Sequence, residues 1–297
     1  NATTVRLTAA DDVVRLGTDN TVRGLTLLPT NEMSGAGIGG SNFGTLTLAG
    51  DVSVNGVPAS AVVLSNGTIA GSFASVRSTN GVAGAVSLTN VSTLGTTTFG
   101  VATDTLRSTM GAVLQVNGGS GSLVFPGVLT NTAGTSAIGL VIQNVTGGAI
   151  TFTGPINPGT TMGAGIRIQN NRGGTITFAG PSLRTRSSVG IDLQNNTGAT
   201  IAFTGGGLDV FGSAGSVPFN ATGGGTLSVL DPTNRNELSS LSAMALNVSG
   251  MTIDAAGLNF TKISAVGNGT GGFTPMSGIL IASPSGSGGL TIRGTGT

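Results

Sequence analysis

The sequence contains no cysteine, tryptophan, tyrosine or histidine, and only 8% of its 297 residues are charged. Without cysteine the chain can form no disulfide and no thiolate metal site, and such a composition fits many exported bacterial proteins. The net charge is +1 and the mean hydropathy is +0.33. An intrinsically disordered chain combines high charge with low apolarity, so this composition excludes that class.

Two further features are lacking, a basic cluster and a long apolar run. The eleven arginines and the single lysine, Lys262, are scattered along the chain, which excludes a nucleic-acid-binding surface. No apolar stretch reaches the roughly 18 residues of a membrane span. The first residue is Asn1 and not a start methionine, so we expect a mature or internal piece of a polypeptide.

The sequence is rich in glycine, with 53 residues, and it contains a clear internal repeat. Three consecutive segments share one pattern: GLVIQNVTGGAITFTGP from Gly139, GIRIQNNRGGTITFAGP from Gly165 and GIDLQNNTGATIAFTGG from Gly190. Apolar residues alternate with polar ones in both halves of each copy, which is the pattern of a strand with one buried face. The Asn- and Gly-rich centre is typical of a turn.

A repeat of about 26 residues with short strands and glycine-rich corners predicts one coil of a parallel β-solenoid. One coil cannot bury its apolar face alone, so coils must stack at about 4.8 Å. The predicted fold is therefore all-β, with about eleven coils in one continuous domain over residues 1–297. We expect surface excursions near 33–41, 231–240 and 267–275.

Stacking predicts columns of one residue type, and two such columns are visible in the sequence. The phenylalanines with spacings of 25 to 27 residues are predicted to form an interior column: Phe73, Phe99, Phe125, Phe152, Phe178 and Phe203. A second column is predicted to be a buried asparagine ladder inside a corner, with each amide bonded to the next coil: Asn66, Asn90, Asn117, Asn144, Asn170, Asn195, Asn220 and Asn247.

These columns, the Thr-, Gly-, Asn- and Ser-rich turns and the lack of cysteine resemble right-handed, single-stranded parallel β-helices. The similarity is to the repeat regions of bacterial autotransporter passengers and large surface adhesins. The segment NTVRGLTLL from Asn20 is also similar to coils of pectate-lyase-like proteins. The resemblance covers nearly the whole chain and implies an exported protein that is part of a longer extracellular or cell-surface polypeptide; it says little about function.

The acidic residues do not form a catalytic pattern. A glycoside hydrolase needs two or three close carboxylates, but only Asp11 and Asp12 are adjacent, and neighbours on a strand face opposite sides. The polygalacturonase-like pattern also needs histidine and lysine. We therefore predict no catalytic residues, no metal site, no cofactor and no enzymatic activity. The segment from Gly205 to Asp209 departs from a calcium-binding nonapeptide because Leu208 stands where glycine is required.

Other polar positions have structural explanations. Arg167 and Asp192 occupy one outward column in consecutive copies, which predicts an ion pair. A second hypothesis places Arg172, Arg184 and Arg186 in a modest basic patch, either a solvated corner or a contact for an anionic glycan. Most Asn-X-Ser/Thr sequons coincide with the expected ladder, so we predict that those asparagines point inward and are not glycosylated.

The sequence thus favours an extracellular structural or adhesive β-solenoid, a stalk or filament segment on a bacterial surface. The alternative is a carbohydrate-active β-helix enzyme or a phage tailspike-like glycan-processing protein. An outward cluster of three acids would favour the enzyme. Expected partners are further coils, of the same polypeptide or of other copies associating end to end, and a surface or matrix glycan. No nucleic acid and no membrane span in this segment are expected.

Overall fold

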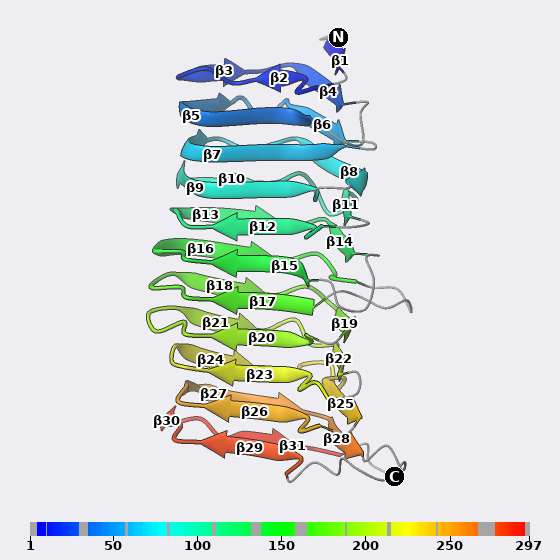
Figure 1. Cartoon of the computed structure of the whole chain (residues 1–297), viewed down its shortest axis with the longest axis vertical. Coiled ribbons are helices and arrows are strands. Elements are labelled where there is room, and N and C mark those ends of the chain that lie inside the picture. Colours follow the sequence, from blue (N-terminus) through cyan, green and yellow to red (C-terminus); the bar gives the residue numbers. More distant parts are fainter. Residues whose placement is uncertain are drawn as a thin grey trace.

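All regular structure in the described chain is β-strand. The computed structural model describes residues 5–9, 11–29, 35–56, 59–81, 84–108, 111–131, 138–157, 165–187, 189–212, 215–241, 243–266 and 277–294. Strands stack in parallel into a β-solenoid whose coils follow one another from β1 to β31 (Figure 1). In these residues no helix is both long and apolar enough to cross a membrane.

The largest sheet has 12 strands and forms one face of the solenoid. Eleven of them follow one another in the order β2 (Val14–Arg15), β5 (Ala36–Leu48), β7 (Ser60–Ala70), β9 (Val86–Leu94), β12 (Leu114–Asn117), β15 (Ile138–Gln143), β17 (Gly165–Gln169), β20 (Ile191–Gln194), β23 (Phe219–Thr222), β26 (Leu246–Ser249) and β29 (Ile279–Ala282), and β3 (Asn20–Val22) pairs with β5 off this path.

The second face is a nine-stranded sheet. It contains β10 (Thr96–Thr98), β13 (Ser120–Phe125), β16 (Gly147–Phe152), β18 (Thr175–Phe178), β21 (Thr200–Phe203), β24 (Thr226–Val229), β27 (Thr252–Phe260) and β30 (Ser285–Gly286), and β31 (Leu290–Ile292) pairs with β27. The register matches the sequence repeat, because Phe152 pairs with Phe178 and Phe178 with Phe203.

The third face consists of a six-stranded and a four-stranded sheet. The first contains β1 (Val5–Ala9), β4 (Leu25–Pro29), β6 (Ser53–Gly56), β8 (Ser75–Gly81), β11 (Thr105–Ser108) and β14 (Val128–Asn131); the second contains β19 (Leu183–Ser187), β22 (Leu208–Gly212), β25 (Glu237–Leu241) and β28 (Lys262–Val266). Isolated bridges from Ile156 to Leu129 and to Leu183 connect the two sheets. The stack is therefore continuous along this face as well.

Six phenylalanines form a single interior stack along the solenoid axis. Consecutive ring centroids from Phe73 to Phe203 lie 4.7 to 5.4 Å apart, and each of these rings is at most 4% exposed. Such a spacing is near the separation of neighbouring strands, so each coil contributes one ring. Beyond Phe203 the column changes, because Val229 takes the equivalent position in β24.

The asparagine column differs from the prediction, since its side chains do not lie inside the corner. Asn66, Asn90, Asn144, Asn170 and Asn195 are exposed and adopt the left-handed backbone conformation, with φ between 51° and 58°. Asparagine tolerates this conformation better than most residues, which explains its recurrence at the corner. A residue in the left-handed conformation ends the alternation of inward and outward side chains along the strand. Counting every second residue into the turn therefore places these asparagines inside, whereas they lie outside.

The remaining ladder positions lie within strands. Asn117 ends β12, and Asn220 and Asn247 lie on the outer face of β23 and β26. Amide hydrogen bonds between coils do occur, from Asn90 to Asn66 at 3.1 Å, from Asn144 to Asn117 at 2.8 Å and from Asn247 to Asn220 at 2.7 Å. They are made by exposed or half-buried side chains. Because the side chains at the exposed sequons do not point inward, the argument against their glycosylation does not hold.

The buried asparagines occupy the next position along the chain. Asn171 and Asn196 are fully buried, and Asn171 Nδ2 donates to Asn196 Oδ1 at 2.8 Å. Their amides also satisfy the backbone, since Val145 N donates to Asn171 Oδ1 at 2.8 Å and Asn196 Nδ2 donates to the Ile168 carbonyl at 2.9 Å. These bonds keep the buried polar groups paired.

The predicted surface excursions are only partly correct. Residues 36–41 belong to β5, where Ala36 and Ile38 are buried, so the expected loop at 33–41 is wrong over that range. Glycines at 37, 39 and 40 let the backbone approach neighbouring residues closely and do not mark a turn. Around 231–240 only residues 232–235 are exposed, because β25 begins at Glu237. The segment 267–275 lies outside the described residues.

Candidate functional site

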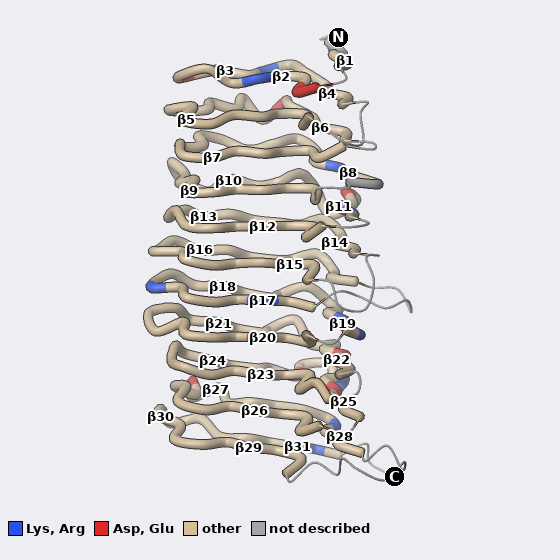
Figure 2. Tube along the Cα trace, viewed as in Figure 1, with Lys and Arg blue, Asp and Glu red and all other residues tan. Residues whose placement is uncertain are grey.

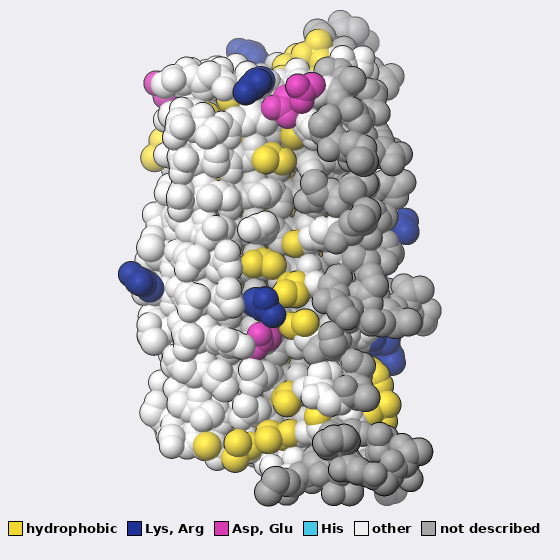
Figure 3. Space-filling model, viewed as in Figure 1, with side chains coloured by type: hydrophobic (Ala, Val, Ile, Leu, Met, Phe, Trp, Pro, Cys, Tyr) yellow, Lys and Arg dark blue, Asp and Glu magenta, His cyan; other side chains and the backbone are white. Residues whose placement is uncertain are grey.

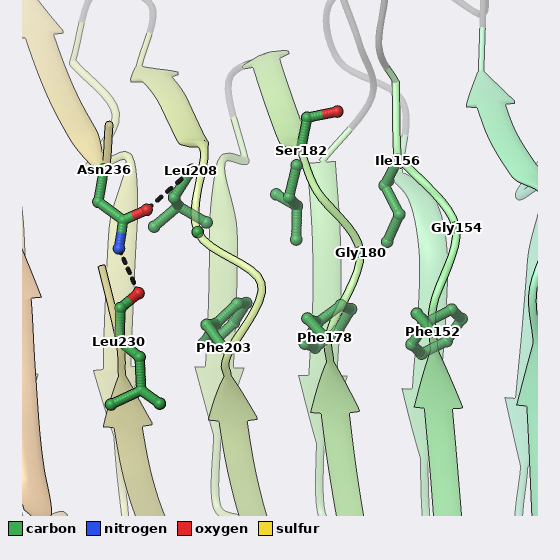
Figure 4. Close-up of a pocket in the computed structure, with 12 residues that line it drawn as sticks. Phe152, Gly154, Ile156, Phe178, Gly180, Ser182, Phe203, Leu208, Leu230 and Asn236 are labelled. Atoms are coloured by element: carbon green, nitrogen blue, oxygen red, sulfur yellow. Dashed lines mark hydrogen bonds between the residues drawn. The ribbon is translucent and has the colours of Figure 1, made fainter. Parts of the chain in front are cut away.

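The interior offers no room for a ligand at the Phe stack. Between Phe152, Phe178 and Phe203 and the third face there is a cavity of about 10 Å³ (Figure 4), which is space for about one water molecule. Asn236 closes one end of it, accepting from Leu208 N at 3.0 Å and donating to the Leu230 carbonyl at 2.7 Å. This region is packed core.

The candidate site is a groove of about 610 Å³ on the third face, which we call the β22 groove. It is lined by Pro181, Ser182, Arg184, Arg186, Gly207, Asp209, Phe211, Asn234, Arg235, Glu237 and Ser239. Strand register creates two outward columns there. One runs from Arg184 through Asp209 and Glu237 to Lys262, and the other runs from Arg186 through Phe211 to Ser239. The volume lies in the range of small-molecule and cofactor sites.

An ion-pair network occupies the centre of the β22 groove. Asp209 Oδ2 accepts from Arg184 Nε at 2.7 Å and from Arg186 Nη2 at 3.4 Å. The Arg186 guanidinium carbon also lies 5.8 Å from the centre of the Phe211 ring, within the range of a cation–π contact. Asp209 therefore lies between two arginines, and these contacts position the side chains of Arg184 and Arg186 in the groove.

The rim of the groove carries further charge. Arg235 is exposed in the turn before β25, and Glu237 begins that strand half-buried. Arg293, from the last described turn, donates to the side-chain carbonyl of Asn234. Four arginines thus meet two acids, Asp209 and Glu237, in or beside one groove. Four of the twelve basic residues of the chain thus lie in or beside the β22 groove.

The structure separates the predicted basic patch. Arg184 and Arg186 line the groove, whereas Arg172 lies between β17 and β18, at the corner that joins the 12-stranded and nine-stranded sheets. In Figure 2 the strands of these two sheets carry few charged positions. Arg172 therefore cannot share a ligand with the groove, and the prediction of a three-arginine patch is wrong.

The predicted pair of Arg167 and Asp192 is confirmed, with Arg167 Nε 3.6 Å from Asp192 Oδ2. Asp192 is buried, which the sequence did not indicate, and it also accepts from Gln194 Nε2 at 2.8 Å and Asn220 Nδ2 at 2.9 Å. On the face shown in Figure 3, most of the described surface is backbone or side chains that are neither hydrophobic nor charged, and charged side chains are few. Side chains of the protein thus occupy both carboxylate oxygens of Asp192, and we assign this residue a structural role.

A second buried acid, Asp104, also has a structural arrangement. Its Oδ1 accepts from Arg77 Nε at 2.7 Å and from Ser75 Oγ at 2.8 Å, and its Oδ2 accepts from Val76 N at 2.8 Å and Val101 N at 3.0 Å. Burial alone would raise the pKa of Asp104, but these hydrogen bonds outweigh it and the pKa lies below the usual value. The carboxylate is thus fixed in its charged form.

The acids that the sequence singled out are not brought together with others. Asp11 is exposed, and Asp12 uses its Oδ1 to accept from Ala36 N at 2.8 Å. Within the described residues, no three acidic, histidine or cysteine side chains are grouped so as to hold a metal ion. Asp209, the acid of the faint calcium motif, is bound by two arginines instead.

The groove residues that sequence reasoning missed are Asp209, Phe211, Arg235 and Glu237. A register signal existed, because Asp209 follows Arg184 by 25 residues, close to the repeat length. The approach of Arg293 to Asn234, 59 residues apart, has no such signal.

Comparisons with protein-family models, with curated protein sequences and with solved structures give no match for this chain.

Proposed function

We propose that the chain is a structural and adhesive segment, a stalk or filament piece of a bacterial surface or secreted protein. The observation that supports this most is the uninterrupted stack from β2 to β29, whose strands are all joined by parallel ladders. Eleven strands at about 4.8 Å give a body about 50 Å long on this face. Such a stack is suited to holding attached groups at a distance from a surface.

The composition supports the same proposal. A chain without cysteine has no disulfide whose loss could weaken it in a reducing environment. The interior is largely apolar and includes the Phe stack, and burial of that apolar surface is the main stabilising contribution. We infer an extracellular or cell-surface location from these features together with the resemblance of the repeats.

Extension of the stack forms part of this proposal. Strand β29 pairs with β26, and in the described part of the chain no strand pairs with its other edge. Apolar side chains gather at this end of the solenoid, where Leu280 is 40% and Ile292 is 44% exposed (Figure 3). An open edge with apolar flanks favours pairing with another coil. We propose that this coil comes from the same polypeptide or from a second copy.

Electron microscopy of the native polypeptide tests the proposal. We expect rods of constant width, and rods of the 297-residue chain longer than one molecule when its concentration is raised. Compact particles of the native polypeptide that carry the solenoid folded back against other domains would contradict a stalk. A measured turnover of polysaccharide would instead favour the enzymatic alternative. No specific feature of the described residues supports that alternative.

A further inference from the structure

The β22 groove combines three kinds of side chain that a charged carbohydrate needs. Arg186 and Arg235 provide positive charge, Glu237 and Ser239 provide hydrogen-bond acceptors, and Phe211 provides a ring surface. Arginine matches carboxylate and sulfate groups with two parallel N–H donors, and an aromatic face packs against apolar ligand surface. The groove is therefore equipped for an anionic ligand that also carries hydroxyl groups.

Arg186 has hydrogen-bonding capacity left over. Its Nη2 reaches Asp209 only at 3.4 Å, and its Nε is buried without a partner among the described residues. The side chain as a whole is 39% exposed, so the guanidinium is accessible from the groove. A buried donor without an acceptor is unfavourable, and the described part of the protein does not fully satisfy Arg186. A ligand oxygen in the groove would pair with the exposed part of this guanidinium, which the long contact to Asp209 leaves available.

The acids of the groove distinguish a saccharide from an acidic peptide. Asp209 and Glu237 lie in register on adjacent strands, and their carboxylates repel a closely spaced row of peptide carboxylates. The same groups accept hydrogen bonds from sugar hydroxyls. Mixed donors and acceptors in one groove thus favour a ligand whose anionic groups are separated by hydroxyl-bearing rings.

We propose that the β22 groove binds an acidic oligosaccharide, with Arg186 and Arg235 holding its carboxylate or sulfate groups and Glu237 and Ser239 contacting its hydroxyls. This inference rests on the adhesive part of the proposed function and gives it a partner and a site. The groove is separate from the stacking edge at β29. A stalk without glycan binding would therefore refute this inference while leaving the structural role intact.

Binding is measured by titration calorimetry of the full chain at low and moderate salt. The probes are a heparin hexasaccharide, a hyaluronan hexasaccharide, neutral maltohexaose and a polyglutamate peptide. We expect binding of at least one acidic saccharide, weakened by salt, and no binding of maltohexaose. The heparin and hyaluronan arms separate sulfate from carboxylate recognition, and either one supports the proposal.

Variants locate the site. Arg186→Gln and Arg235→Gln are each expected to weaken binding by ~10-fold, which corresponds to about 1.4 kcal/mol. The matched control is Arg172→Gln, an exposed arginine at another corner, which should leave the affinity unchanged. If Arg186→Gln impairs folding, as judged by circular dichroism, the exposed Arg235→Gln carries the test alone.

Three results would overturn the proposal. The first is no binding of either acidic saccharide. The second is an equal loss of affinity in Arg172→Gln, which would show nonspecific attraction to scattered charge. The third is polyglutamate binding as tight as that of the saccharides, which would make an acidic peptide the ligand. Rods seen by electron microscopy alongside any of these results would leave the stalk proposal standing.

Discussion

Asn171 Nδ2 donates to Asn196 Oδ1 at 2.8 Å, and both side chains are fully buried between consecutive coils. The exposed asparagines that precede them, Asn170 and Asn195, adopt the left-handed backbone conformation. Each of these corners thus uses one asparagine for backbone conformation and the next for interior hydrogen bonding. The two roles predict different responses to mutation.

Asn171→Ala should destabilise the solenoid strongly, because it removes the acceptor of Val145 N and a donor to Asn196. Each buried group left without a partner costs about 1–3 kcal/mol. Asn170→Gly is the matched control, since glycine also adopts positive φ and the side chain removed is exposed; it should change little. Denaturant unfolding of both variants measures the difference. Equal midpoints for the two would contradict the assignment of the interior role to Asn171.

Phe178→Ala should lower the free energy of unfolding by about 3–5 kcal/mol, because the ring is 4% exposed and stacks between Phe152 and Phe203. The control is Thr177→Ala, a half-buried neighbour on the outer side of the same strand. Its effect should be small. If the denaturation midpoint of Phe178→Ala stayed at that of the unmodified chain, the Phe column would not be a stabilising core.

Lowering the pH should reduce the stability that the charged Asp104 carboxylate contributes to the folded protein. Because hydrogen bonds lower the pKa of this carboxyl in the folded protein, its stabilisation is fully present above the unfolded pKa of about 3.9 and is lost as the pH falls toward the lower folded value. Thermal unfolding between about pH 5 and pH 2 measures this loss. Asp104→Asn should be less stable at neutral pH and should show a smaller decrease on acidification. An identical pH profile in both proteins would exclude this linkage.

We predict no hydrolase or lyase activity on acidic polysaccharides. Asp11 and Asp12 are not grouped with a third acid in the described residues, and Asp209 is engaged by two arginines. Release of reducing ends or unsaturated products is measured with the full chain. Turnover that disappears in Asp11→Asn would show that a catalytic site exists at the beginning of the solenoid.

The fold could be predicted from the sequence because stacking repeats the same local pattern. Alternation around Ile168 and Ile176 and the spacing of the phenylalanines are sufficient for a parallel solenoid with about 26 residues per coil. The corner was predicted incorrectly because one left-handed residue shifts the alternation, as Asn170 and Asn171 show.

The candidate groove could be predicted only in part. The sequence predicts Arg184 and Arg186 as part of a basic patch with Arg172, but their partner Asp209 belongs to the next coil, and the third face is divided into two sheets. Arg235 and Arg293 reach the groove from turns whose paths are set by tertiary contacts, such as that between Arg293 and Asn234. Periodicity contains no information on such contacts.

The central claim is that one uninterrupted stack carries the function, and amide hydrogen exchange over minutes to hours tests it most directly. The account predicts strong and contiguous protection from β12 to β26, with faster exchange in β31 at the open end. A central strand such as β17 or β20 that exchanges as fast as β31, while strands on both sides stay protected, would show a break in the stack and would contradict the proposed stalk.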